Sequence, residues 1–231
     1  MLTFIRTNTV PHRFAEAGTW LELFFDLVYV AILVELGNRL SHDLSWAGVV
    51  QFLFLFIIVW WSWLEKVLYN RYFLNDDIGY RLLTFLYMAL MGLMAFNIHE
   101  VTGSTAVYFL LAYAASKFVM VLMYTRAWNE YPQYRPMTRI YIITFAAAAI
   151  SWFAIAIFAP TNFLLWALIS AFGLLIQAIV PVIQSISNKQ SIETPPIKKH
   201  FMLHRFGELT IIVLGEFFLK VIITASEREV Y

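Results

Sequence analysis

The sequence predicts an all-α protein, a polytopic transmembrane bundle of about seven helices, and three observations support this fold class. Hydrophobic residues make up 61% of the 231 residues, charged residues 13%, and the mean hydropathy is +0.71, outside the soluble globular range. Mostly apolar runs of about 18 or more residues recur, each long enough to cross a ~30 Å hydrocarbon core as a helix. Lys and Arg alternate between rich and poor connections. The runs lie at 20–37, 46–64, 82–98, 105–124, 140–159, 163–184 and 206–224.

Each of the first five runs has a distinguishing composition. The first carries acidic residues, which are considered below. The second begins with Phe and Leu, which favours a lipid-facing position, and ends in VWWSW (59–63), typical of the aromatic belt at a membrane interface. The third, fourth and fifth contain several Ala, Gly and Ser residues. Because small residues allow close helix contact in lipid, we expect these three to form the packed interior.

The sixth and seventh runs are separated by the longest polar stretch. Pro181 should loosen the end of the sixth run because proline removes a backbone donor. The segment that follows contains Thr-Pro-Pro (194–196), which resists helix. We therefore expect a six-span bundle (1–184), a cytoplasmic linker (185–204) and a seventh span (205–231), which we consider as the opening helix of a second, truncated repeat.

The distribution of basic residues predicts the orientation. Twelve of the 16 Lys and Arg residues fall in the N-terminal segment and in the second, fourth and sixth connections, and two fall on the opposite side. Positive connections stay in the cytoplasm, so the N-terminus is predicted inside and the C-terminus outside. The net charge of +1 is explained by this topology and indicates no nucleic-acid partner. Residues 1–18 are too polar for a signal peptide, so we expect the first span to be retained.

Several classes of chemistry find no support. The chain has no cysteine, which excludes disulfides, cysteine nucleophiles and thiolate metal sites. Phosphate-binding loops, nucleophile elbows and zinc helices are not found, so we predict no enzymatic activity and no cofactor. His200, His204 and Glu208 recur with a spacing that could hold a divalent metal, but such residues at a helix start are more often solvated, and we predict no metal site.

The first span carries two carboxylates on one helix face. Glu22 and Asp26 share that face with Tyr29, and charges at membrane depth are functional candidates by default. They suggest a buried proton or cation site. The alternative is that Glu22 lies at the cytoplasmic headgroup level and that Asp26 is paired with a base for stability. Glu35 points to the opposite side and is interpreted as a partner of Arg39, four residues on.

Bases inside the spans are the expected partners of these acids. Lys117 lies ~10 Å from the cytoplasmic end of the fourth span, and Asp26 lies ~9 Å into the first, so we prefer an Asp26–Lys117 ion pair. The alternative is that Lys117 snorkels to the interface. In the seventh span Glu216 precedes Lys220 by one turn, which favours a pair within the helix. Arg205 and Glu208 are three residues apart and suit a salt bridge.

The candidate site follows from these patterns. The candidates for binding an ion or proton are Glu22, Asp26, Glu208 and Glu216. Their expected charge partners are Lys117, Arg205 and Lys220.

Two passages, WLELFFDLVYV (20–30) and RFGELTIIVLGE (205–216), resemble those of the bacterial low temperature requirement protein A family. VWWSW (59–63) and YTRA (124–127) extend the resemblance over nearly the whole chain. The family's motifs map onto Glu22, Asp26, Arg205, Gly207, Gly215 and Glu216. The chain departs from the family at His204, where Glu is more usual, and at Glu208, where an apolar residue is more usual.

The resemblance implies a multi-pass protein of the bacterial cytoplasmic (inner) membrane. The family's name comes from a requirement for growth in the cold, and it supplies no mechanism. Members are usually longer, so we expect this chain either to be truncated or to complete its second half as a homo-oligomer.

Three functions remain open from the sequence. The leading hypothesis is a transporter or channel for an ion or small solute, with proton coupling as one form of it, in which Asp26 and Glu216 bind the cation or proton and Lys117 and Lys220 balance their charge. A second is a non-transporting membrane protein for cold or stress adaptation, whose charges only fix helix pairing. A remote third is a retinal-binding protein that uses Lys220, because a desolvated lysine can form a Schiff base.

Overall fold

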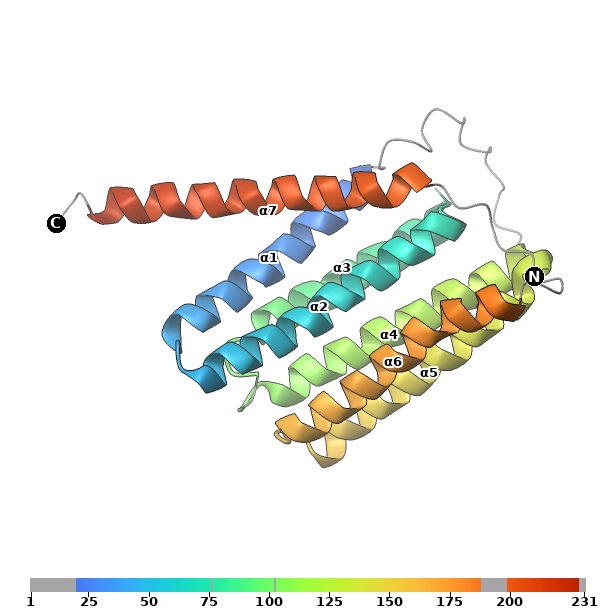
Figure 1. Cartoon of the computed structure of the whole chain (residues 1–231), viewed down its shortest axis with the longest axis horizontal. Coiled ribbons are helices and arrows are strands. Elements are labelled where there is room, and N and C mark those ends of the chain that lie inside the picture. The colour runs from blue at the N-terminus through green and yellow to red at the C-terminus, as the bar shows by residue number, and fades with distance from the viewer. Residues whose placement is uncertain (1–19, 76, 102, 188–198, 229–231) are drawn as a thin grey trace.

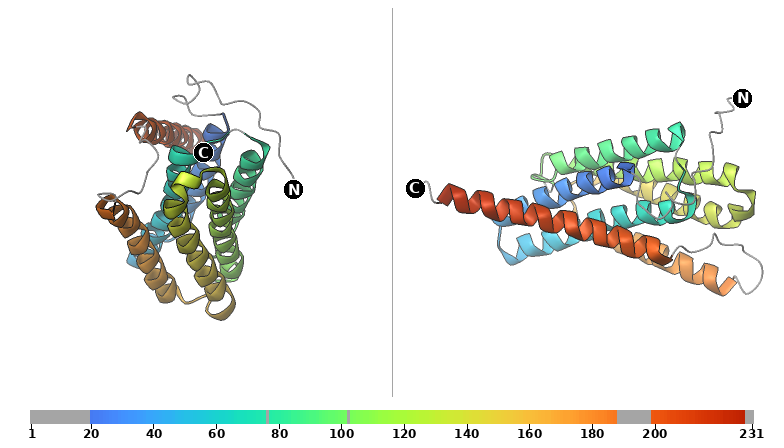
Figure 2. Two further views of the ribbon diagram at one scale, coloured as in Figure 1. Left: turned by 90° about the vertical axis from the view of Figure 1, so that its right-hand side faces the viewer. Right: turned by 90° about the horizontal axis from the view of Figure 1, so that it is seen from above.

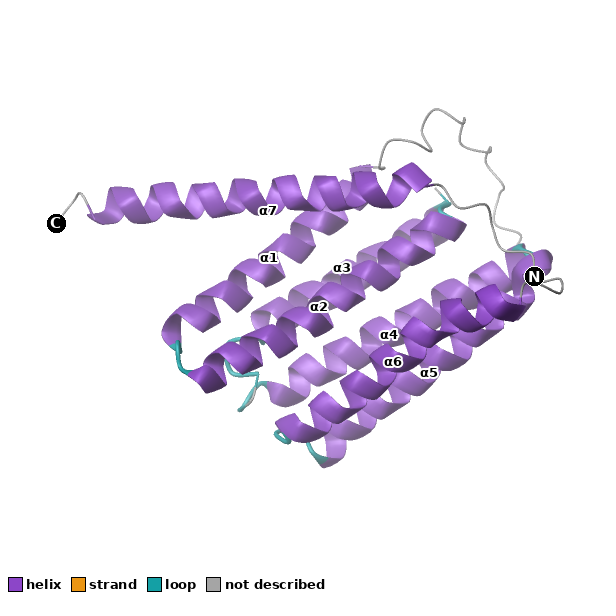
Figure 3. Ribbon diagram, in the orientation of Figure 1, coloured by secondary structure: helices purple, strands orange, loops and turns teal. Residues whose placement is uncertain are grey.

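The computed structural model describes residues 20–75, 77–101, 103–187 and 199–228. These residues form seven α-helices and a short 3-10 helix, with no strand among them (Figure 3). The prediction of an all-α bundle with about seven spans is confirmed, while its orientation in the membrane stays a prediction. The elements are α1 (Trp20–His42), α2 (Trp46–Phe73), α3 (Ile78–Phe96), α4 (Ala106–Glu130), η1 (Pro132–Tyr134), α5 (Arg135–Phe158), α6 (Phe163–Ser187) and α7 (Lys199–Arg228).

Four helical stretches in the described part are long and apolar enough to cross a membrane: α2, α3, α4 and residues 132–158, which include α5. The chain is therefore built as a multi-pass membrane protein. The helices α1 and α7 carry more ionisable residues than these four, as the sequence indicated.

Helices α1 to α6 run side by side, whereas α7 leans on α1 and α2 with its first half and extends beyond them (Figures 1 and 2). The closest packing is between α4 and α5. In α4, 61% of the most apolar stretch is buried, against 28% in α2, 33% in α3 and 28% in residues 132–158. The expected close contact among the third, fourth and fifth spans is confirmed, because α4–α5 and α3–α4 are the two most extensive helix contacts, but only α4 has most of its apolar stretch buried.

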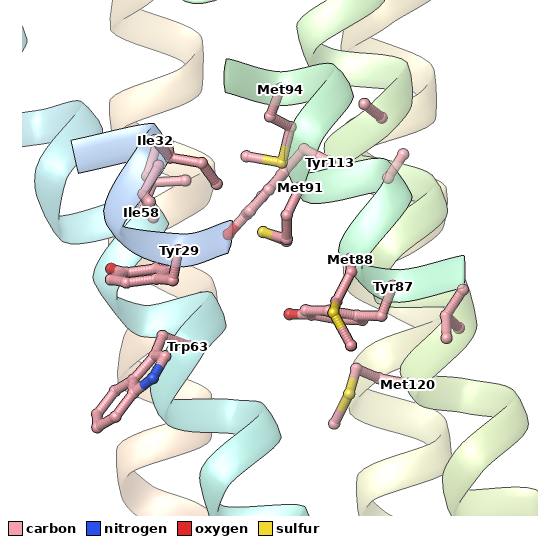
Figure 4. Close-up of a cluster of buried hydrophobic side chains, with 14 of the residues drawn as sticks. Tyr29, Ile32, Ile58, Trp63, Tyr87, Met88, Met91, Met94, Tyr113 and Met120 are labelled. Carbon is pink, nitrogen blue, oxygen red and sulfur yellow. The ribbon is translucent and has the colours of Figure 1, made fainter. Parts of the chain in front are cut away.

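Aromatic and methionine side chains fill the core between α1, α2, α3 and α4. Figure 4 shows Tyr29 and Trp63 beside each other, facing Tyr87 and several methionines. The rings of Tyr29 and Trp63 have centroids 6.1 Å apart, and Trp63 also meets Phe206 of α7 edge-on at 5.2 Å. Such ring pairs add ~0.5–1.5 kcal/mol each beyond their buried area, so Trp63 helps to join three helices.

The second helix continues well past the end that the sequence suggested. It begins after Ser45, whose side chain accepts a hydrogen bond from the backbone N–H of Gly48 at 3.1 Å, and it runs to Phe73. The prediction that ends the second run at residue 64 places Lys66 among the basic residues of the connection that follows, and this placement is wrong. The structure places Lys66 inside α2 with 0% of its surface exposed.

Candidate functional site

Polar and charged side chains gather in the interior where α1, α2, α3, α4 and α7 meet. On α2 these side chains belong to Ser62, Glu65, Lys66 and Asn70, and their spacing places them on adjoining faces of the helix, so they contact different neighbouring helices. Buried charges require partners, and these side chains divide into three hydrogen-bonded groups. The members of these groups that are more than nine-tenths buried are Glu22, Asp26, Ser62, Glu65, Lys66, Asn70, Lys117 and Arg205.

The first group joins α7 to α1 and α2 through Asp26 and Arg205. Oδ1 of Asp26 accepts hydrogen bonds from Arg205 Nη2 at 2.6 Å and from Trp63 Nε1 at 2.8 Å. Both charged side chains are almost fully buried, with 0% and 1% exposed. Arg205 also donates to Glu208 at 2.9 Å and to the backbone carbonyl of Glu22 at 3.2 Å. The predicted Arg205–Glu208 salt bridge is confirmed.

The second group surrounds Lys66. Nζ of Lys66 donates to Oδ1 of Asn70 at 2.7 Å and to the hydroxyl of Tyr80 at 3.2 Å, and it lies 4.5 Å from the centre of the Tyr80 ring. Asn70 Nδ2 in turn donates to Glu22 Oε1 at 2.9 Å. Glu22 is buried against α2, with 2% exposed, rather than solvated at the start of its helix. The group links a carboxylate to an ammonium through one amide.

The third group holds Lys117 and corrects the preferred ion pair. Lys117 forms a salt bridge with Glu65 of α2, donates to Ser62 Oγ at 3.1 Å and lies 4.4 Å from the centre of the Tyr113 ring. The predicted Asp26–Lys117 pair is wrong, because equal depth fixes only one coordinate and α4 packs mainly on α5 and α3. Snorkelling of Lys117 is also wrong, since its side chain is 2% exposed.

A groove of about 650 Å³ lies between α1, α3 and the part of α7 that contains Ile212 and Glu216. Glu35, His99 and Glu216 are its ionisable lining residues, and Leu27, next to Asp26 in the chain, lines it too. Glu35 pairs with His99 at 2.8 Å, so the expected Glu35–Arg39 pair is wrong.

Arg39, near the end of α1, forms its hydrogen bonds with residues of other elements. It donates to Gln51 Oε1 at 2.8 Å and to the backbone carbonyl of Ile98 at 3.4 Å. These contacts draw it to the connection after α3 and away from its own helix, which explains why the local spacing with Glu35 was misleading.

One face of α7 carries the residues that turn towards α1. Arg205, Glu208, Ile212 and Glu216 recur at i, i+3, i+7 and i+11, so they share that face. The first two meet the Asp26 group and the last two line the groove. The Lys220 side chain lies outside the described residues, so its pairing with Glu216 stays a prediction.

No cluster of three His, Asp or Glu residues suited to a metal occurs within the described side chains. His204 pairs with Glu208 at 3.2 Å. The His200 side chain lies outside the described ones, so the metal alternative for this helix start is not tested.

Sequence reasoning missed Glu65, Lys66 and Asn70 because it ended the second span at residue 64. One signal was present: Val59, Trp63 and Val67 continue an apolar stripe with helical spacing through this segment. Reading that stripe to its end would have placed these polar residues inside a helix.

Comparison with known proteins gives a family and one partial relative. The family described as bacterial low temperature requirement A protein matches residues 17–231. An uncharacterised protein of Rhizobium meliloti (strain 1021) is 31% identical over 94 residues, which cover 41% of this chain and 23% of that protein. The similarity thus spans under a quarter of that relative's length. No solved structure matches the chain.

Proposed function

Because the chain belongs to the bacterial low temperature requirement A family, we propose that it is a transporter or channel for an ion or small solute in the bacterial cytoplasmic membrane. Its intramembrane carboxylates bind the cation or proton. Family membership establishes a multi-pass membrane protein, and the activity is proposed from the arrangement of its charges.

One observation carries this proposal: the groove between α1, α3 and α7 is lined by ionisable groups, and Leu27, which follows Asp26 in the chain, lines it too. A carboxylate or imidazole at membrane depth costs several kcal/mol unless it faces protein or a wet cavity, so such residues mark ion and proton paths. Glu216 of α7 is such a group, and the Glu35–His99 pair, whose side chains are 36% and 53% exposed, adds a carboxylate and an imidazole where α1 and the connection after α3 border the groove.

Arg205 offers a way to couple binding to movement of α7. Its guanidinium bonds Asp26 on α1 and Glu208 on its own helix at once. A proton or cation that binds Asp26 neutralises the carboxylate and weakens its hold on Arg205. Arg205 then stays with Glu208, and the first half of α7 loses its strongest attachment to α1. Arg205 is therefore the charge partner of Asp26 in this proposal, in place of Lys117.

The test is the flux of protons and of a panel of common ions in proteoliposomes. Glu216→Gln and Asp26→Asn are compared with the unaltered chain, after circular dichroism and gel filtration show that each is folded. Glu130→Gln is the control, because Glu130 ends α4, its side chain is 37% exposed, and it lies outside the groove. We expect flux in the unaltered chain and the control, and its loss in Glu216→Gln.

Two other results would contradict the proposal. Equal flux in all four proteins would remove the carboxylates from the path. The absence of flux from every protein across the panel would favour the non-transporting role, in which the charges only fix helix pairing.

A further inference from the structure

A second cavity, separate from the groove, opens between α2, α4, α5 and α6. Its volume is about 220 Å³, and the Glu65–Lys117 pair forms part of its wall. An apolar cavity of ~150 Å³ is enough to hold benzene, so this one has room for a molecule of that size and a few atoms more.

The wall combines small and aromatic residues. Ala147 and Ala148 of α5 leave the space open, and a Cβ built on Gly173 of α6 would meet no atom within 4 Å. The rings of Tyr113 and Trp152 pack edge-on at 4.9 Å on the inner side. This lining resembles that of small-molecule sites, which are mostly apolar with a few polar groups that fix orientation.

Two buried polar atoms of this wall have no hydrogen-bond partner within the described part of the chain. They are Oε1 of Glu65 and the hydroxyl oxygen of Ser170, on residues with 5% and 7% of their surface exposed. Leaving a buried acceptor unpaired costs about 1–3 kcal/mol, and more for a charged group. Both atoms would therefore gain from a ligand that supplies a hydrogen-bond donor.

The charges of the site favour a neutral donor. Lys117 already neutralises Glu65, while it also meets Ser62 and the Tyr113 ring. A second cation here would be repelled by Lys117 in a medium of low dielectric, whereas a hydroxyl can donate to Oε1 of Glu65 and exchange a hydrogen bond with Ser170.

The cavity is bordered on the outside by lipid-type surface. Its lining includes Ile143 and Phe172, whose side chains are 59% and 68% exposed on α5 and α6. In a multi-pass membrane protein such apolar side chains face hydrocarbon. A ligand dissolved in the bilayer can therefore reach the cavity from the side.

We propose that the cavity between α2, α4, α5 and α6 binds a small neutral amphiphile, with its hydroxyl on Glu65 and Ser170 and its apolar body against Trp152 and the alanines of α5. The site is independent of the proposed ion path, since none of its described lining residues lies in the groove.

The test uses a photoreactive diazirine derivative of 1-octanol and the matched diazirine alkane, with labelled peptides of the membrane-embedded full chain located by mass spectrometry. We expect the alcohol to label the α5 and α6 wall in a saturable way, displaced by excess 1-octanol, and the alkane to label it several-fold less. Ala148→Trp should abolish this labelling by filling the cavity. Ile150→Trp is the matched control, because Ile150 is 70% exposed on the same helix and does not line the cavity.

Ser170→Ala tests the polar half of the site. Loss of one neutral hydrogen bond should weaken displacement by 1-octanol about three- to tenfold. Labelling that is unsaturable, that survives Ala148→Trp, or that is equal for alcohol and alkane would overturn the proposal. Photolabelling requires no transport, so an absence of flux would contradict the proposed function and leave this site standing.

Discussion

The Asp26–Arg205 pair allows a quantitative prediction of stability. Both side chains are almost fully buried and their nearest atoms are 2.6 Å apart. Removal of one partner of a buried ion pair costs about 3–5 kcal/mol because the other charge is left uncompensated, whereas replacement of both is often near neutral. Asp26→Asn, Arg205→Met and the double variant therefore form an informative cycle.

The two single variants should differ in cost. After Asp26→Asn, Arg205 keeps Glu208 at 2.9 Å, so the loss should be near ~3 kcal/mol. After Arg205→Met, Asp26 keeps only the Trp63 hydrogen bond, so the loss should be near ~5 kcal/mol. The double variant should cost less than Arg205→Met alone.

The assay is reversible unfolding by SDS in mixed micelles, followed by circular dichroism. Glu130→Gln serves as the control, because exposed pairs such as Arg126–Glu130 contribute below ~1 kcal/mol. Additive losses in the cycle, or single losses no larger than that of the control, would refute the inference that Asp26 and Arg205 form an interacting buried pair.

Three further predictions test the rest of the arrangement. Trp63→Phe removes the indole N–H that donates a charge-assisted hydrogen bond to Asp26, and it should lower the free energy of unfolding by about 1.5–3 kcal/mol in the same assay. A decrease below about 0.5 kcal/mol would contradict this hydrogen bond. Lys66 should resist amine-reactive reagents in intact membranes and detergent alike, since it is 0% exposed, and rapid modification in the folded protein would place it outside the bundle. The chain has no cysteine, so single cysteine variants report the topology directly. Gly103→Cys should react with an impermeant thiol reagent from outside the cell, whereas Pro132→Cys should react only after permeabilisation. The reverse pattern would show that the predicted orientation is inverted.

Helical spacing predicted one local pairing correctly and another wrongly, since Glu35 and Arg39 are four residues apart but Glu35 pairs with His99 and Arg39 with Gln51. Arg205 and Glu208 are three residues apart, and their salt bridge forms as expected. The number of helices was predictable, since the length and composition of each apolar run are local properties.

Pairings between helices could not be predicted, because depth in the membrane leaves the neighbours of a helix undetermined. Asp26 and Lys117 have similar depths, but Asp26 meets α7 and Lys117 meets α2. Helix ends were a second source of error: the second span was ended at residue 64, and Glu65 was thereby removed from consideration as the partner of Lys117.

The central claim is that the groove between α1, α3 and α7 is a wet path for ions, and Ala31→Cys tests it most directly. Ala31 lines the groove near the middle of α1 and is exposed there. A water-soluble thiol reagent should modify this cysteine in proteoliposomes and reduce the flux, while Ile150→Cys on the outer face of α5 should be unreactive. An unreactive Ala31→Cys, or full flux after its modification, would contradict the account.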